Sequence, residues 1–195
     1  MSKPNLYLDI DGVIIDTIKC IVGLYNDDFY YYKDYKRIYP EDINTYDFSE
    51  CMCANKDFIN TYFNTKRFFD NVEFMENAQE TIYMLNNFYN ITLVSHGFSP
   101  NLRAKVDWIN YNLPFVKFIG INLKESNDKS SVDMSNGIFV DDKVSNLISS
   151  NAKEKIIFGK KYPWNIEDNG YKRFETWIKL YTYLRNKITG GLQLG

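Results

Sequence analysis

The sequence contains little histidine, cysteine and proline, and their scarcity excludes several kinds of protein. Its 195 residues include one histidine, three cysteines and five prolines. The cysteines, Cys20, Cys51 and Cys53, offer only a C-x-C pair, and His96 lies far from them, so a zinc site lacks ligands. An odd number of cysteines also argues against a disulfide framework. We therefore expect reduced cysteines in a cytoplasmic protein.

Long apolar runs and an excess of basic residues are also lacking. No window of about 18 apolar residues occurs, and the N-terminus has no signal-peptide core, so we expect no membrane association. The net charge of −2 argues against stable binding of nucleic acid, because such binders usually carry a basic surplus. Hydrophobic residues make up 45% of the chain and aromatic residues 17%, which is enough for a real core. The length suits one domain, or one domain with a modest insertion.

Strand and helix patterns alternate along most of the chain. This alternation predicts an α/β protein with an open, Rossmann-like parallel sheet. Expected strands are 6–10, 91–94, 115–121, 137–142 and 154–158, and expected helices are 16–32, 55–66, 76–88, 99–112, 144–150 and 173–187. The tail from 189 to 195 is expected to be loose.

The long segment between the first two strands interrupts this alternation. It spans roughly 80 residues and shows helical patterns but no convincing strand, whereas a simple crossover needs far fewer residues. We therefore predict a small helical cap inserted after the first strand. The expected domains are a core of residues 1–17 and 76–195, and a cap of residues 18–75.

Polar residues stand where three of the predicted strands end, and a lysine stands in the loop before one of them. In open α/β sheets, ligands bind outside the carboxyl ends of the strands. If the strands are neighbours, these groups meet around one point, and several carboxylates together require a cation, for which oxygen ligands favour Mg²⁺. The residues are Asp9, Asp11, Ser95, Lys129, Asp141 and Asp142.

Such a site suits phosphoryl transfer to an aspartate. A carboxylate nucleophile divides a difficult hydrolysis into two easier steps, and Mg²⁺ with Lys129 would offset its repulsion of the phosphate. Asp11 projects to the same side as Asp9 in an extended chain, so it can exchange protons with the leaving group and water. Gly12 would let the backbone approach the phosphate. Taken alone, D-x-D-G also occurs in turns and calcium loops, and "VDD" also occurs at helix N-termini.

At this point the sequence resembles the haloacid dehalogenase-like (HAD) superfamily of aspartate-nucleophile phosphatases. Its four motifs correspond to "DIDGV" at 9–13, "LVSHG" at 93–97, Lys129, and "FVDDK" at 139–143. Within that superfamily the chain is most similar to the 5′(3′)-deoxyribonucleotidase branch. That similarity runs over about residues 5–187 and includes the stretches 39–48, 67–85, 155–165 and 173–184.

The resemblance implies a role for each of these residues. Asp9 would be the nucleophile and a Mg²⁺ ligand, and Asp11 the acid/base that lends its backbone carbonyl to the metal. Ser95 and Lys129 would bind the phosphate. Asp142 would complete the metal ligands, with Asp141 beside it.

The resemblance also implies a (deoxy)nucleoside monophosphate as substrate, with its base gripped by aromatic residues of the cap. Phe48 and Phe63 are the first candidates, followed by Tyr46, Tyr62 and Phe68, and the alternative for each is the core of the cap. His96 either contacts substrate or is partly buried beside the pocket. Thr17 replaces an aromatic residue that is frequent in the branch.

We therefore predict a Mg²⁺-dependent phosphatase that acts on nucleoside monophosphates through an aspartyl-phosphate. The alternatives are a phosphatase for another small phosphomonoester or a nucleic-acid end, and a catalytically silent nucleotide-binding module. Base preference, 5′ or 3′ specificity and the formation of a homodimer stay open at this point.

Overall fold

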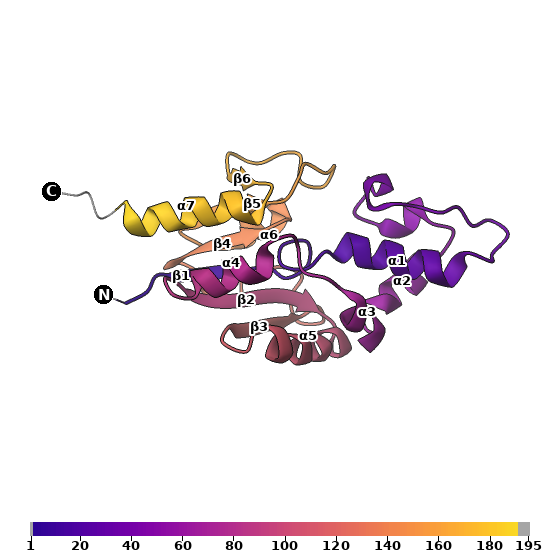
Figure 1. The fold of residues 1–195 in the computed structure, drawn as a ribbon, viewed down its shortest axis with the longest axis horizontal. Coiled ribbons are helices and arrows are strands. Elements are labelled where there is room, and N and C mark those ends of the chain that lie inside the picture. The colour runs from indigo at the N-terminus through magenta and orange to yellow at the C-terminus, as the bar shows by residue number, and fades with distance from the viewer. Residues whose placement is uncertain (1, 191–195) are drawn as a thin grey trace.

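The centre of the computed structural model, which describes residues 2–190, is a six-stranded sheet with the order β3-β2-β1-β4-β5-β6. Every neighbouring pair of strands is parallel. This arrangement confirms the predicted Rossmann-like α/β fold (Figure 1). The strands are β1 (Asn5–Leu8), β2 (Asn90–Gly97), β3 (Lys117–Asn122), β4 (Gly137–Asp141), β5 (Glu154–Phe158) and β6 (Lys172–Phe174).

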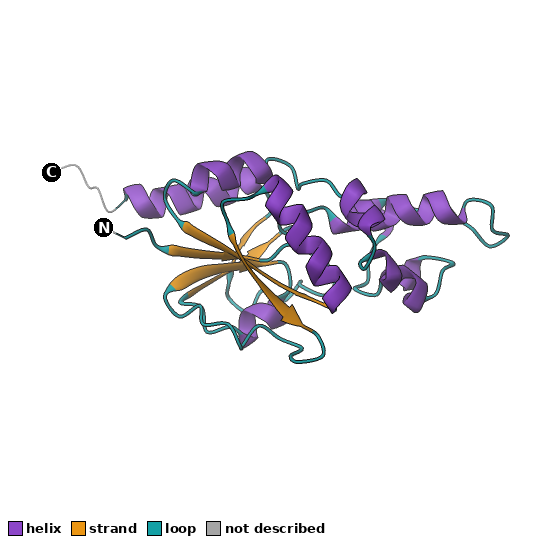
Figure 2. Ribbon diagram, turned by 90° about the horizontal axis from the view of Figure 1, so that it is seen from below, coloured by secondary structure: helices purple, strands orange, loops and turns teal. Residues whose placement is uncertain are grey.

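The two faces of the sheet are covered by different helices, as Figure 2 shows. Alternate strand residues point to opposite faces, so Leu6 and Leu8 belong to one hydrophobic cluster and Tyr7 to the other. Helices on the Leu6 face are α4 (Ala78–Leu85), α5 (Ser99–Asn112) and α7 (Trp177–Thr189). The opposite face packs against α6 (Val144–Ser149).

The register of the central strands brings their carboxyl ends to one level. Leu8 pairs with Leu93 on one side and with Val140 on the other. The next residue along, Asp9, donates its backbone N–H to the Val140 carbonyl over 2.9 Å. Asp9 and Asp141 therefore leave neighbouring strands at the same edge of the sheet.

The segment between β1 and α4 is helical and lies beyond the carboxyl ends of the strands (Figure 1). Side-chain caps begin its α-helices: Asp16 accepts from the N–H of Lys19, Asn55 from Phe58, and Thr65 from Phe68. Its elements are α1 (Thr17–Phe29), the 3₁₀ turns η1 (Pro40–Asp42) and η2 (Phe48–Cys51), α2 (Lys56–Tyr62) and α3 (Lys66–Asn71).

The chain enters and leaves this helical segment through two strips that pair with each other. The Asp16 N–H donates to the Glu73 carbonyl over 2.9 Å, and the Met75 N–H donates to the Ile14 carbonyl over 2.8 Å. These two hydrogen bonds join the start and the end of the helical segment, as expected where a segment is inserted into the connection between a strand and the next helix. The division of the chain into a core and a cap of residues 18–75 stays a prediction.

Most expected elements are present, and their bounds differ from the prediction by at most three residues except in two cases. The helix expected at 55–66 is two short helices, because the turn after Tyr62 lets Thr65 cap the second one. The helix expected from residue 173 begins at Trp177, because residues 172–174 instead pair with β5 as an edge strand. The tail predicted to be loose lies mostly outside the described residues. No helix within 2–190 is long and apolar enough to cross a membrane.

Candidate active site

Three carboxylates meet where β1 and β4 end. Each of Asp9, Asp141 and Asp142 offers an oxygen, and these oxygens all lie within 4.8 Å of one another. Asp9 and Asp141 are buried, with 5% and 0% exposure, while Asp142 is partly exposed. The convergence expected from the sequence is therefore present between residues more than a hundred positions apart.

Gly12 is required by this convergence in two ways. Its φ of 72° lies in the left-handed region, which side chains other than glycine adopt at a cost. A Cβ atom at this position would also lie 2.8 Å from Oδ2 of Asp142. The glycine after the "DID" run therefore lets the loop after β1 approach a carboxylate of the loop after β4.

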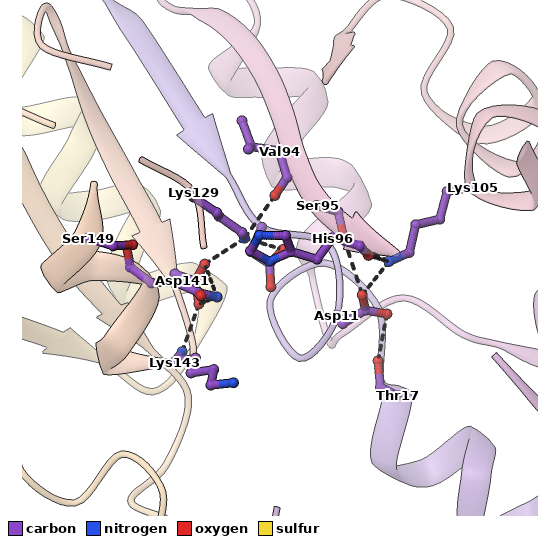
Figure 3. Close-up of polar contacts among 12 residues, drawn as sticks. Asp11, Thr17, Val94, Ser95, His96, Lys105, Lys129, Asp141, Lys143 and Ser149 are labelled. Atoms are coloured by element: carbon purple, nitrogen blue, oxygen red, sulfur yellow. Dashed lines mark hydrogen bonds and ion pairs between the residues drawn. The ribbon is translucent and has the colours of Figure 1, made fainter. Parts of the chain in front are cut away.

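Lys129 is buried between two of the carboxylates, and Figure 3 shows its contacts with Asp141 and with the carbonyl of Val94. Its Nζ donates to Oδ1 of Asp9 and to Oδ2 of Asp141, each over 2.7 Å, and to the carbonyl of Val94 over 2.9 Å. Burial lowers the pKa of Lys129, but the negative charges of Asp141 and Asp9 outweigh it and raise the pKa above its usual value. The lysine is therefore held as a cation.

The surroundings of Asp9 and Asp142 disfavour the charged forms of both carboxylates. The pKa of Asp9 is raised to about 7, because burial, together with the charges of Asp141 and Asp11, outweighs the opposing charge of Lys129. Burial and the charges of Asp141 and Asp9 likewise raise the pKa of Asp142 well above its usual range. One ammonium does not balance three carboxylates, so this part of the site favours a further cation.

The free oxygens of this group fit a divalent metal. Both oxygens of Asp141 are already engaged, by Lys129, by Asn146 Nδ2 and by the N–H of Lys143. Oδ2 of Asp9 and both carboxylate oxygens of Asp142 accept no hydrogen bond from any residue in the range 2–190. Hard oxygen donors of this kind are the ligands of Mg²⁺ and similar cations.

On the other side of the site, Asp11 and Ser95 share a partner that our sequence interpretation missed. The Nζ of Lys105 on α5 donates to Oδ2 of Asp11 over 2.5 Å, to Oγ of Ser95 over 2.7 Å and to the carbonyl of His96 over 3.1 Å (Figure 3). Oδ1 of Asp11 accepts from Oγ1 of Thr17 over a long 3.5 Å.

A sequence signal for Lys105 exists in the helix pattern. The buried positions of α5 include Asn101, Lys105, Trp108 and Ile109, which recur at helical spacing. A lysine on the face that carries Trp108 and Ile109 needs a buried partner. The same face meets the helical segment, because Nδ2 of Asn101 donates to the Phe63 carbonyl over 2.6 Å.

His96 is half-buried beside the site. Burial lowers its pKa below the ordinary value. Its Nε2 is buried and has no hydrogen-bond partner among residues 2–190. This location agrees with the interpretation of His96 as a histidine partly buried beside the pocket, with a contact to substrate as the alternative.

The aromatic candidates in the helical segment between β1 and α4 divide into buried and exposed residues. Tyr62 and Phe68 are core residues, with 4% and 0% exposure. Phe48 and Phe63 are partly exposed and pack against that core, so their rings retain surface for a ligand. Tyr46 is the most exposed of the five, at 57%.

Tyr46 lies next to the three carboxylates and near two aromatic residues of the segment between β5 and β6, Tyr162 and Trp164. Its ring is 4.2 Å from Nζ of Lys143 and 6.0 Å from the Trp164 ring, which stacks on Tyr162 at 4.3 Å. Desolvation, followed by the charges of Asp142 and Asp11, raises the pKa of the Tyr46 hydroxyl. The segment between β5 and β6 therefore contributes to this surface, which the sequence did not indicate.

Comparisons with known proteins agree with this geometry. The family described as 5′ nucleotidase, deoxy (pyrimidine), cytosolic type C protein matches residues 3–189. A 5′(3′)-deoxyribonucleotidase of Clostridium acetobutylicum is 27% identical over 182 residues, which cover 92% of this chain and 93% of that protein.

Solved structures of HAD hydrolases share the fold. A haloacid dehalogenase-like hydrolase of Streptococcus pneumoniae superimposes with a TM-score of 0.65 at 11% identity, covering 93% of this chain and 98% of that one. A HAD hydrolase of Bacillus subtilis, bound to magnesium, gives a TM-score of 0.60 at 10% identity, covering 94% and 99%. At these identities the likeness concerns the fold alone.

Proposed function

The chain belongs to the 5′ nucleotidase, deoxy (pyrimidine), cytosolic type C family, within the HAD superfamily of phosphatases, and we propose that it hydrolyses (deoxy)nucleoside monophosphates to nucleoside and phosphate. The observation that carries this proposal is the meeting of Asp9, Asp142 and Lys129 at one edge of the sheet, with Asp11 beside them. The family name also supports a cytoplasmic location.

Asp9, Asp142 and the backbone carbonyl of Asp11 would bind Mg²⁺ from the protein. The free carboxylate oxygens described above support this choice, and the magnesium-bound relative of Bacillus subtilis is consistent with it. When bound, the cation supplies positive charge that offsets the repulsion between a carboxylate and a phosphate dianion. Asp141 instead keeps Lys129 in place through its 2.7 Å ion pair.

The reaction then proceeds in two displacements at phosphorus. An oxygen of Asp9 attacks the phosphorus and the ester P–O bond breaks, while Asp11 gives its proton to the leaving alkoxide. Water next attacks the phosphorus of the aspartyl-phosphate, and Asp11 takes a proton from that water. The P–O bond to Asp9 breaks, so inorganic phosphate leaves and the carboxylate is restored. Lys129 and Ser95 would bind the phosphate oxygens.

Residues 18–75 would serve as the cap over this site. Phe48 and Phe63 retain partly exposed rings, and Tyr46 stands beside Asp142, so these side chains are placed to contact the base of a nucleotide. Stacking on aromatic rings recognises a base in a way that a sugar phosphate cannot match. This reasoning favours nucleotides over other small phosphomonoesters.

Phosphate release from a panel of substrates tests the proposal. Deoxynucleoside and ribonucleoside 5′- and 3′-monophosphates are compared with sugar phosphates, each with Mg²⁺ and with EDTA. We expect Mg²⁺-dependent release that is at least about tenfold faster from nucleotides. Equal rates with sugar phosphates would refute the nucleotide preference. Inactivity with every substrate would support the silent binding module instead.

A further inference from the structure

Lys105 is the buried charged residue that the reaction described above leaves without a role. Only 1% of its surface is exposed, although it lies on a helix whose neighbouring residues Arg103 and Val106 are exposed. Burying an ammonium costs free energy unless every N–H donor finds a partner. The partners here are a carboxylate, a hydroxyl and a carbonyl, so its three donors are all used.

These partners orient the two polar groups on this side of the site. Because Lys105 binds Oδ2 of Asp11, the other oxygen, Oδ1, is left with only the long contact to Thr17. Oδ1 is therefore the oxygen available for proton exchange. Oγ of Ser95 accepts from Lys105 over 2.7 Å, and the Ser95 hydroxyl in turn has Oδ2 of Asp11 at 3.3 Å and the His96 carbonyl at 3.4 Å as acceptors.

We propose that Lys105 is a positioning residue that fixes Asp11 for proton transfer. This inference rests on the proposed function, because it assigns Asp11 the exchange of protons with the leaving group. Among residues 2–190, Lys105 forms no hydrogen bond or ion pair with Asp9 or Asp141, so its effect on proton transfer reaches the reacting atoms through Asp11.

The dependence on the leaving group tests this role. A deoxynucleoside monophosphate releases an alkoxide that needs a proton, whereas p-nitrophenyl phosphate releases a weakly basic phenolate that does not. In Lys105→Met we expect kcat/KM to fall about 30-fold for the nucleotide and less than about threefold for the aryl ester. Arg103→Met, on the exposed face of the same helix, is the control and should change neither value.

The outcomes separate this inference from the proposed function. Equal losses for the two substrates in Lys105→Met would refute positioning of the acid/base and leave the phosphatase proposal intact. Wild-type inactivity on both substrates would refute the proposed function and this inference with it. Should Lys105→Met fail to fold, as judged by near-UV circular dichroism, Lys105→Gln undergoes the same test.

A double-mutant cycle of Lys105→Met with Asp11→Asn distinguishes a role of Lys105 through Asp11 from a purely structural role. If Lys105 acts through Asp11, its removal matters little once the acid/base is gone. In the Asp11→Asn background we expect Lys105→Met to lower kcat/KM for the nucleotide by less than about threefold. A loss of the same 30-fold size in both backgrounds, about 2 kcal/mol each, would contradict the inference.

Discussion

The two sides of the site each contain a buried lysine, but the charges around the two lysines differ. Lys129 pairs with Asp9 and Asp141, and a further carboxylate stands next to them. Lys105 pairs with a single carboxylate, that of Asp11. Negative charge is therefore in excess on the Lys129 side and balanced on the Lys105 side.

This difference matches the chemistry proposed for each side. An excess of carboxylates attracts a divalent cation and tolerates a phosphate only when that cation is bound. A balanced ion pair has no such need, and it holds a carboxylate in one orientation for proton transfer. The predictions below test this contrast, starting with the change of largest expected effect.

Asp9→Asn should abolish turnover, because an amide cannot attack phosphorus and the metal site loses a ligand. We expect kcat to fall at least about 10³-fold on a nucleoside monophosphate. Phosphate release measures this, and circular dichroism with substrate-binding calorimetry establishes that the variant is folded and still binds. Retained turnover would show that the Lys129 side does not contain the nucleophile.

Lys129→Met should destabilise the protein more than Lys105→Met does. The carboxylates that Lys129 leaves unpaired have side-chain exposures of 8% and 0%, whereas that of Asp11 is 30%. Removing one partner of a buried ion pair costs about 3–5 kcal/mol. Water can solvate Asp11, so the cost there is smaller, about 1 kcal/mol. Urea unfolding in EDTA measures the free energy of unfolding of the two variants. Equal losses of that free energy would show that the two sides of the site do not differ in this way.

Gly12→Ala should weaken the contact between the loops after β1 and β4. The positive φ and the 2.8 Å approach to Asp142 together cost about 1–3 kcal/mol. We expect a lower free energy of unfolding and a higher Mg²⁺ concentration for half-maximal activity. Gly23→Ala in α1 is a matched control, because its Cβ meets no atom within 4 Å and alanine favours a helix. An unchanged Mg²⁺ requirement in Gly12→Ala would argue against a metal at Asp142.

The Lys129 side could be predicted from the sequence, because its geometry follows from the sheet. Parallel strands that end just before Asp9 and Asp142 must bring those residues to one edge, and Gly12 after a D-x-D run indicates a close approach there. The regular alternation of strands and helices predicted the fold in the same way. On the Lys129 side, the local sequence pattern and the order of the strands therefore predict the same site.

The Lys105 side could not be predicted as directly, because a lysine in a helix is most often solvated. Only the tertiary contact of α5 with the loop after β1 buries Lys105 and brings it to Asp11. The stacking of Trp164 near Tyr46 likewise depends on two irregular segments whose paths the sequence does not specify. Strand β6 is three residues long, too short to show a strand pattern.

Thr17→Val should have a smaller effect than Lys105→Met, although both residues contact Asp11. The hydroxyl of Thr17 is 3.5 Å from Oδ1, at the limit of a hydrogen bond, so it contributes little to the orientation of the carboxylate. We expect kcat/KM for a nucleotide to fall by no more than about threefold, with valine filling the same volume. Side-by-side kinetics of the two variants measures the ratio. A loss in Thr17→Val as large as that in Lys105→Met would assign the positioning of Asp11 to the helical segment rather than to α5.

His96→Gln should have the smallest effect, visible only in the pH dependence of stability. Burial lowers the pKa of His96, so the unfolded chain takes up a proton at a higher pH than the folded protein does. As the pH falls through the unfolded pKa toward the folded one, that uptake favours unfolding and the wild type loses stability relative to the variant. The ring is half-buried, so we expect a difference of only about 0.5 kcal/mol between pH 7 and pH 5.

Because His96 is the only histidine of the chain, comparing the urea unfolding of wild type and variant separates the contribution of His96 to the pH dependence of stability from that of the carboxylates. A wild type that gains stability relative to the variant on acidification would show that the ring is paired as a cation. It would also place a third positive charge at the boundary between the two sides.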